Sequence, residues 1–435
     1  MDYGRLLSNY DYAELRLGKG HESYITIRDD EVRNVSGSVE GISVRVLIGG
    51  SWGFASSSRV GDAPGLIKRA ERLAKLERGR IKVKEASPVN EKVEERIEPA
   101  DSEQQVKRLL EASKDLKAEH ITSRMVMCSD GISQREFYDS HGSHILQETV
   151  STYMSCSCVA RSGKLIQRGS HRGWSRSGFS KIEPSAIAEE AREKALRLLK
   201  AAPPPKGRFT VVLDPEMTGV FSHEAVGHAC EADAVVDKDS VLADRLGKSI
   251  GSGLVTIIDD PTADDFGRYA FDDEGVQARP VTLVDKGVLK AFLNSKETAA
   301  HLGMEPNGHA RADGYDSVPA VRMSNTYLQR GKSSVDDVFD VRKGVYLKGM
   351  KGGSVDIFSG GFMFKAEEAY EIEDGEKGRI MRDVTITGNI LETLLNVECV
   401  GDDFGSSPGM CGKSAQQVPV SDGGPHIRVK DVAIG

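Results

Sequence analysis

The stretch 201–213, AAPPPKGRFTVVL, divides the sequence into two halves of different character. Its three consecutive prolines, Pro203, Pro204 and Pro205, end a preceding helix and force an extended segment. Residues 209–213 then form an apolar, β-branched run that is typical of a strand. The sequence therefore predicts an N-terminal domain over residues 1–203 and a second domain over residues 204–435.

Strands and helices alternate in groups before the prolines. Short strand-like segments cover residues 12–56, and a helix is expected where Leu66, Ile67, Ala70 and Ala74 recur on one face. Residues 79–100 are charged and without periodicity, which indicates an exposed connection. A second helix is expected from Asp101 or Ser102, strands over about 121–180, and a third helix over about 184–200. This order is typical of an α+β domain.

The second half is expected to be rich in β structure. A strand over 209–213 is followed by the helix-start signal Asp214-Pro215, and from about residue 253 the sequence is mostly short β segments. The 46 glycines among 435 residues exceed the usual share of about 7%, while the prolines number only 15. We therefore predict an α+β fold, a mixed α/β domain followed by a β-rich domain with many turns.

Composition and charge exclude several classes of protein. The 58 basic and 66 acidic residues give a formal net charge of −8, which argues against nucleic acid as a partner. No apolar run approaches the length of a membrane span, and the first residues do not resemble a signal peptide. Six scattered cysteines are no disulfide framework in a chain this long. We expect a cytoplasmic protein with reduced thiols.

The stretch 221–233, FSHEAVGHACEAD, carries the residue types of a metal site. His223 and His228 are five residues apart, which places them about 140° apart around a regular helix, too far to share one ion. Either the pair is accidental, serving packing or the surface, or the helix contains an extra residue as a π-bulge or break. We expect such a distortion at Gly227. Glu224 is the type of residue that acts as a base on metal-bound water, and Glu231 and Asp233 are possible supports for the ligands.

The chain resembles the TldD/PmbA family of metallopeptidases along most of its length. The resemblance includes GISVRVLIGGSWGFASSS near the start and, in order, HEAVGHACEAD, FDDEGV, VDKGVLKAFLNSKETAAHLG, RMSNTYL, GGSVDIFSGGFMFKAEEAYEIEDGE and CGKSAQQVPVSDGGP. The intact HExxxH motif resembles the catalytic, TldD-type members rather than their motif-lacking partners. The resemblance implies that the β-rich domain carrying the motif helix is catalytic.

The resemblance also implies a zinc site. Its ligands would be His223, His228 and Cys411, with Glu224 as the base, and this donor set leaves a fourth position for water. Cys411 is expected in a loop between Gly409 and Gly412. Glu231 remains an alternative third ligand, as the glutamate is in dipeptidyl peptidase III, whose HExxGH motif HEAVGH also resembles. Cys230 is expected to be a packing residue, and Cys399 to lie in a strand.

The expected activity is hydrolysis of extended, unfolded peptides. The resemblance implies that the peptide lies in a narrow cleft as an added β-strand. In the segment RMSNTYL, Arg322, Ser324, Asn325 and Thr326 are candidates for contacts with the peptide, although a sheet edge or a buried hydrogen-bond network would also explain them. The family implies a dimer, formed with a second copy or with a motif-lacking homologue. A non-catalytic regulatory subunit and a cysteine hydrolase that uses Cys411 are the alternative functions.

An acidic group without an assigned role lies between residues 259 and 274. It does not have the spacing of an EF-hand loop, so we expect solvated turns. Its members are Asp259, Asp260, Asp264, Asp265, Asp272, Asp273 and Glu274, the last three within the FDDEG segment.

Overall fold

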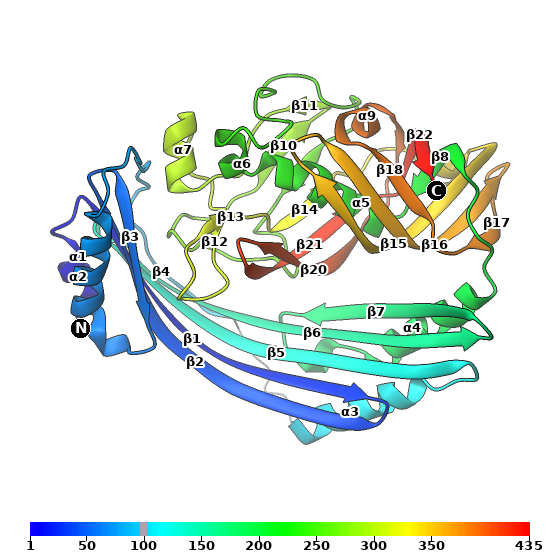
Figure 1. Cartoon of the computed structure of the whole chain (residues 1–435), viewed down its shortest axis with the longest axis horizontal. Helices are drawn as coiled ribbons and strands as arrows, with labels where there is room; N and C mark the ends of the chain where they lie inside the picture. Colours follow the sequence, from blue (N-terminus) through cyan, green and yellow to red (C-terminus); the bar gives the residue numbers. More distant parts are fainter. Residues whose placement is uncertain (96–101) are drawn as a thin grey trace.

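The computed structural model describes residues 1–95 and 102–435. Long curved strands of the first half extend beneath the sheets of the second half, which lie on their concave side (Figure 1). The expected α+β fold is confirmed by this arrangement. The predicted boundary after residue 203 lies between the last helix of the first half and the first strand of the second half.

The first half is built on one seven-stranded sheet in the order β3-β2-β1-β5-β6-β4, with β7 paired to β6. Helix α2 packs on one end of the sheet, and α3 and α4 pack over β5, β6 and β7. The strands are β1 (Tyr12–Arg28), β2 (Glu31–Ile48), β3 (Ser51–Ser57), β4 (Asn90–Val93), β5 (Ile121–Asp139), β6 (His144–Ser162) and β7 (Leu165–Ser175). The helices are α1 (Tyr3–Leu7), α2 (Ala63–Ala74), α3 (Ser102–Asp115) and α4 (Pro184–Leu199).

The three predicted helices of this half are confirmed within a few residues of their expected bounds. The expectation for residues 79–100 was partly wrong, because strand β4 pairs in parallel with β6 inside that segment. The pairing was not visible in the sequence, since Asn90–Val93 contains two charged residues and only one apolar residue. Residues 96–100 of that segment and residue 101, one of the two expected starts of α3, lie outside the described residues.

The second half contains two larger sheets with the motif helix between them. One sheet has the order β11-β10-β9-β14-β21-β20, and the other has the order β15-β8-β22-β18-β16-β17, with β19 paired to β22. Helix α5 packs on β21 from the first sheet and on β15 from the second. A shared core includes Phe221, Val226, Met323 and Cys411, so the motif lies at the centre of this half.

The remaining elements have the following bounds. The strands are β8 (Gly207–Leu213), β9 (Ile257–Asp259), β10 (Val281–Asp285), β11 (Val288–Leu289), β12 (Ala310–Arg311), β13 (Ala320–Val321), β14 (Asn325–Leu328), β15 (Lys343–Asp356), β16 (Gly361–Glu373), β17 (Glu376–Met381), β18 (Thr385–Asn389), β19 (Val397–Val400), β20 (Gly405–Lys413), β21 (Gln416–Gly424) and β22 (Ile427–Ile434). The helices are α5 (Pro215–Phe221), α6 (Ala232–Val236), α7 (Lys296–Leu302), α8 (Val335–Phe339) and α9 (Ile390–Leu395).

The FDDEG segment joins the two halves through ion pairs of its buried carboxylates. Arg45 of β2 lies 2.6 Å from Glu274 and 2.8 Å from Glu14. Arg135 of β5 lies 3.0 Å from Asp273. The expectation of solvated turns was therefore wrong for this segment, because arginines from the first half supply the opposite charge.

No helix within residues 1–95 and 102–435 is long and apolar enough to cross a membrane.

Candidate metal centre

The histidines of the motif lie on an irregular helix. Asp214 caps α5 by accepting a hydrogen bond from the Met217 N–H, and α5 continues into a π-helical turn over Ser222–Gly227. The His228 N–H donates to the His223 carbonyl, five residues back rather than four. The predicted distortion is thus confirmed, and the extra residue brings the two imidazole rings to 5.2 Å between centroids.

Cys411 completes a cluster with these histidines. One ligand atom each from His223, His228 and Cys411 lie within 4.8 Å of one another, and the Cys411 Sγ is 3.7 Å from the His228 Nε2. The expected loop around Cys411 was wrong, because the residue lies in strand β20. Gly409 and Gly412 follow the ladder with β21, and neither has a left-handed φ.

Carboxylates behind the cluster orient both imidazoles. The Asp422 Oδ1 lies 2.7 Å from the His223 Nδ1, and the Glu231 Oε2 lies 3.1 Å from the His228 Nδ1. A carboxylate at Nδ1 favours the tautomer whose Nε2 is free to bind a metal. Glu231 therefore supports His228 from behind, and the third donor of the cluster is Cys411.

Lys413 fixes the support of His228. Its Nζ donates to Glu231 at 3.0 Å and to Asp233 at 2.8 Å. Asp233 thus contacts this lysine rather than a histidine, which differs from its expected role. Because Lys413 follows Cys411 by two residues on β20, it links the strand that carries the thiol to the segment that carries His228.

The cluster favours a thiolate next to protonated imidazoles when it holds no metal. Burial opposes ionisation of Cys411, but hydrogen bonds and charges from His223 and His228 outweigh it and lower the thiol pKa to about 5. Burial opposes the imidazolium form of His228, but Glu231 and Cys411 outweigh it and raise the pKa of His228 to about 10. A thiolate and two imidazoles at this spacing suit zinc, which accepts both ligand types and keeps a fourth position for water or substrate.

Glu224 lies beside the cluster on its accessible side. Its Oε2 is 3.9 Å from the His228 Nε2, and its side chain is 36% exposed. A carboxylate in this position can exchange a proton with a water molecule at the cluster.

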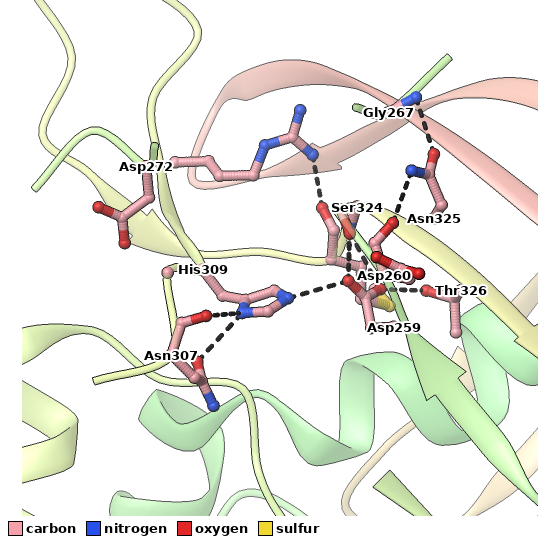
Figure 2. A network of polar contacts seen from close by, with 12 residues as sticks. Asp259, Asp260, Gly267, Asp272, Asn307, His309, Ser324, Asn325 and Thr326 are labelled. Atoms are coloured by element: carbon pink, nitrogen blue, oxygen red, sulfur yellow. Dashed lines mark hydrogen bonds and ion pairs between the residues drawn. The ribbon is translucent and has the colours of Figure 1, made fainter. Parts of the chain in front are cut away.

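The candidate peptide contacts belong to a buried network. Arg322 is fully buried and donates a hydrogen bond to the Cys411 carbonyl. Figure 2 shows that Asn325 bonds to the 260–267 loop and that Ser324 and Thr326 point toward Asp259. These contacts agree with the alternative of a buried hydrogen-bond network.

Asp259 is the centre of this network. It accepts hydrogen bonds from Ser324, from Thr326 at 2.6 Å and from the His309 Nε2 at 3.0 Å (Figure 2). Burial opposes ionisation, but these donors hold the pKa of Asp259 below its ordinary value. The expectation of a solvated turn was wrong for Asp259, because its side chain is fully buried among these donors. Its partner His309 lies fifty residues further along the chain, so the local sequence did not reveal the contact.

Four residues of the site were missed from the sequence. Asp422 and Lys413 lie in the segment CGKSAQQVPVSDGGP, but no spacing marked them as partners of the histidines. His309 contacts Asp259, and the Met323 side chain packs against Gly227. Both contacts join residues distant in sequence, so no local pattern indicated them.

Comparisons with known proteins place the chain in a family of metallopeptidases. Family models match residues 13–76 (PmbA/TldA metallopeptidase domain 1), 95–199 (the central domain) and 206–435 (the C-terminal domain). A metalloprotease of Methanothermobacter thermautotrophicus is 44% identical over 98% of this chain and 95% of its own length. A zinc metalloprotease TldD homolog of Saccharolobus solfataricus is 31% identical over 98% and 96%.

Solved structures share the fold. The crystal structure of TldE from Thermococcus kodakarensis matches with a TM-score of 0.81 at 22% identity, covering 100% of this chain and 98% of that one. A putative modulator of a DNA gyrase from Thermotoga maritima matches with a TM-score of 0.79 at 21% identity, covering 97% and 96%.

Proposed function

The chain belongs to the PmbA/TldD family of metallopeptidases, and on this premise we propose that it is a zinc-dependent peptidase that hydrolyses extended, unfolded peptides. The observation that carries the proposal is the cluster of His223, His228 and Cys411 within 4.8 Å, with the partly exposed Glu224 beside it. The relative named as a zinc metalloprotease supports zinc as the metal.

Each residue of the site has a separate role in the proposed hydrolysis. His223, His228 and Cys411 would hold the ion, and Asp422 and Glu231 keep the imidazoles oriented. Zinc bound there supplies a Lewis acid for the water and for the scissile carbonyl. Glu224 takes a proton from the attacking water and passes it to the leaving amine.

The strand that carries Cys411 offers a place for the peptide backbone. Strand β20 is the last strand of its sheet, so an extended peptide can pair with it through main-chain hydrogen bonds. Such pairing requires an unfolded substrate and depends little on its side chains. The family implies assembly with a second copy or a motif-lacking homologue, and we include such a dimer in the proposal.

A second candidate, a cysteine hydrolase, is favoured by the contact of the Cys411 Sγ with the His228 Nε2 at 3.7 Å. The two neighbouring imidazoles lower the pKa of Cys411 to about 5, which favours a nucleophilic thiolate. Such an enzyme needs no metal and would not need Glu224. The two candidates therefore make opposite predictions for chelation.

The test is zinc content together with cleavage of an unstructured peptide. The wild-type protein should bind one zinc per chain and lose cleavage on chelation, with recovery when zinc is restored. Glu224→Gln should retain zinc and lose cleavage, whereas Cys411→Ser should lose or weaken the metal. Cleavage that survives chelation would support the cysteine hydrolase, and zinc binding without cleavage of any peptide would support a regulatory subunit.

A further inference from the structure

Strand β20 (Gly405–Lys413) is the edge strand beside the metal cluster. It pairs antiparallel with β21 on one side, and no strand within residues 1–95 and 102–435 pairs with its other side. Figure 1 shows β20 on the side of the second half that faces β6 and β7. Ser406, Met410 and Gly412 of this strand are exposed, so solvent reaches the edge along much of its length.

The hydrogen bonds of β21 define which residues of β20 face the open edge. The Ser421 N–H donates to the Ser324 carbonyl at 3.1 Å, which turns the backbone of Ser421 toward β14. Successive residues of a strand turn their backbone groups to alternate sides, so Val420 and Asp422 face β20. Their partners there are Gly409 and Ser407. The backbone groups of the even-numbered residues 406, 408, 410 and 412 therefore point to the open edge.

Pro408 interrupts this row of groups. Ser406, Met410 and Gly412 each offer an N–H and a carbonyl, whereas Pro408 offers a carbonyl alone because proline has no N–H. The ring of Pro408 is buried, while the flanking edge residues Ser406 and Met410 are exposed. The open edge thus has a single missing donor in the interior of the strand.

The missing donor lies on the stretch of β20 that runs beside the metal cluster. On the face of β20 toward the motif helix, Ser407 lies opposite Asp422, which contacts His223, and Cys411 lies two residues beyond Gly409. A Cβ built on Gly409 would lie 3.9 Å from the Asp422 Oδ2. Along the strand, Gly409 therefore lies between the residue opposite Asp422 and the thiol of Cys411, and Pro408 precedes Cys411 by three residues.

We propose that Pro408 leaves one carbonyl of the bound peptide without a ladder partner beside the metal cluster, and so fixes the position along β20 at which the peptide is cleaved. This inference rests on the proposed peptidase function and on pairing of an extended peptide with β20. The peptide carbonyls opposite Ser406, Met410 and Gly412 each accept a hydrogen bond from an N–H and are held in the ladder. The carbonyl opposite Pro408 meets none, so it is free to turn toward the cluster and accept attack by water. Pro408 is thus a positioning residue, with no direct part in the reaction.

The first measurement is the affinity for an intact peptide. Zinc-loaded protein carrying Glu224→Gln and a fluorescently labelled unstructured peptide allow binding to be followed by anisotropy without cleavage. Pro408→Ala adds an N–H at the edge and should tighten binding about fivefold, which corresponds to the net free energy of one additional hydrogen bond. Ser406→Pro removes a donor from the same edge and should weaken binding by a similar factor.

The second measurement separates KM from kcat in protein that retains Glu224. Pro408→Ala should lower KM and also lower kcat by about tenfold, because the new N–H holds the carbonyl that must react. If Pro408 served only the folding of the strand, Pro408→Ala would instead weaken peptide binding or reduce the zinc content. Pro419→Ala is the matched control: Pro419 lies in the adjacent strand β21 with no access to the open edge, and this variant should leave affinity unchanged.

Equal or weaker peptide binding by Pro408→Ala, with zinc content and folding intact, would overturn the proposal. An unchanged kcat would overturn it as well. Should Pro408→Ala fail to fold, Ser406→Pro still decides whether the peptide pairs with this edge, and unchanged affinity in that variant counts against the proposal. If the wild-type chain cleaves no peptide at all, the proposed function fails, whereas the affinity comparison continues to test the missing donor.

Discussion

Met323 occupies the space that a side chain at position 227 would need. A Cβ built on Gly227 would lie 1.9 Å from the Met323 sulfur. Met323 is itself fully buried, and its carbonyl accepts a hydrogen bond from Arg311. The π-helical turn that aligns His223 with His228 therefore fits against a fully buried side chain, whose backbone is bound by Arg311.

Gly227→Ala should consequently weaken zinc binding. The added methyl group must displace Met323 or the turn, and overpacking of this kind typically costs about 1–3 kcal/mol. Because displacement of the turn separates the histidines, we expect zinc affinity, measured by competition with a chelator, to fall at least about tenfold. The double variant Gly227→Ala/Met323→Ala should recover most of the loss, since the smaller side chain makes room. A double variant no better than Gly227→Ala would show that the methyl group acts in another way.

The carboxylate behind His223 should matter for metal binding without touching the metal. Asp422→Asn removes the charge that lies 2.7 Å from the His223 Nδ1, and loss of such a support typically costs about 10–100-fold in metal affinity. Zinc affinity by chelator competition is again the measurement. Asp403→Asn is a matched control, because Asp403 lies 2.8 Å from the Nδ1 of His426, which is not part of the cluster. Equal affinities for the two variants would contradict the role of Asp422.

The motif itself was predictable from spacing, but its third partner was not. Two histidines five residues apart cannot meet on a regular helix, so an extra residue was a geometric requirement, and the structure contains it. Cys411 is 183 residues from His228 in sequence, and only the resemblance to a family indicated it. Its neighbours Gly409 and Gly412 suggested a loop, because glycine is common in turns, yet they lie in a strand.

Burial of charge was the main feature hidden from the sequence. Asp259 and the FDDEG segment read as solvated turns, since acidic residues are mostly exposed. Their partners, His309 and arginines of the first half, come from distant positions that no local pattern reveals. The run of polar residues in RMSNTYL likewise did not distinguish a substrate contact from an internal network.

The ion pairs between the halves should contribute strongly to stability. Arg45 is buried between Glu14 and Glu274, and Arg45→Met would leave two neighbouring carboxylates buried without their cation. Removal of one partner from a buried pair typically costs about 3–5 kcal/mol. We expect the free energy of unfolding by urea to fall by about that amount. Lys75→Met, which breaks an exposed pair with Glu71, is the control and should produce no measurable change. A similar loss in both variants would indicate that burial of the pair is unimportant.

The cap of the motif helix should make stability depend on pH near neutrality. Asp214 accepts hydrogen bonds from the Met217 and Gly349 N–H groups, but burial raises its pKa from 3.8 to about 7. The folded protein therefore keeps this proton up to about pH 7, whereas the unfolded chain releases it near pH 3.8. The resulting contribution to stability is fully present below pH 3.8 and is lost as the pH rises through 7.

Asp214→Asn removes this titration while it retains a carbonyl oxygen for the helix cap. Between pH 4 and 7 the unfolding free energy of the wild type, relative to that of Asp214→Asn, should fall by up to about 1.4 kcal/mol per pH unit. Urea unfolding of both proteins at matched pH values measures the difference directly. A constant offset due to the amide facing the Gly349 N–H would not affect the slope. Parallel stability curves across this range would show that Asp214 is already ionised in the folded protein, and the dependence of the helix cap on protonation would then be absent.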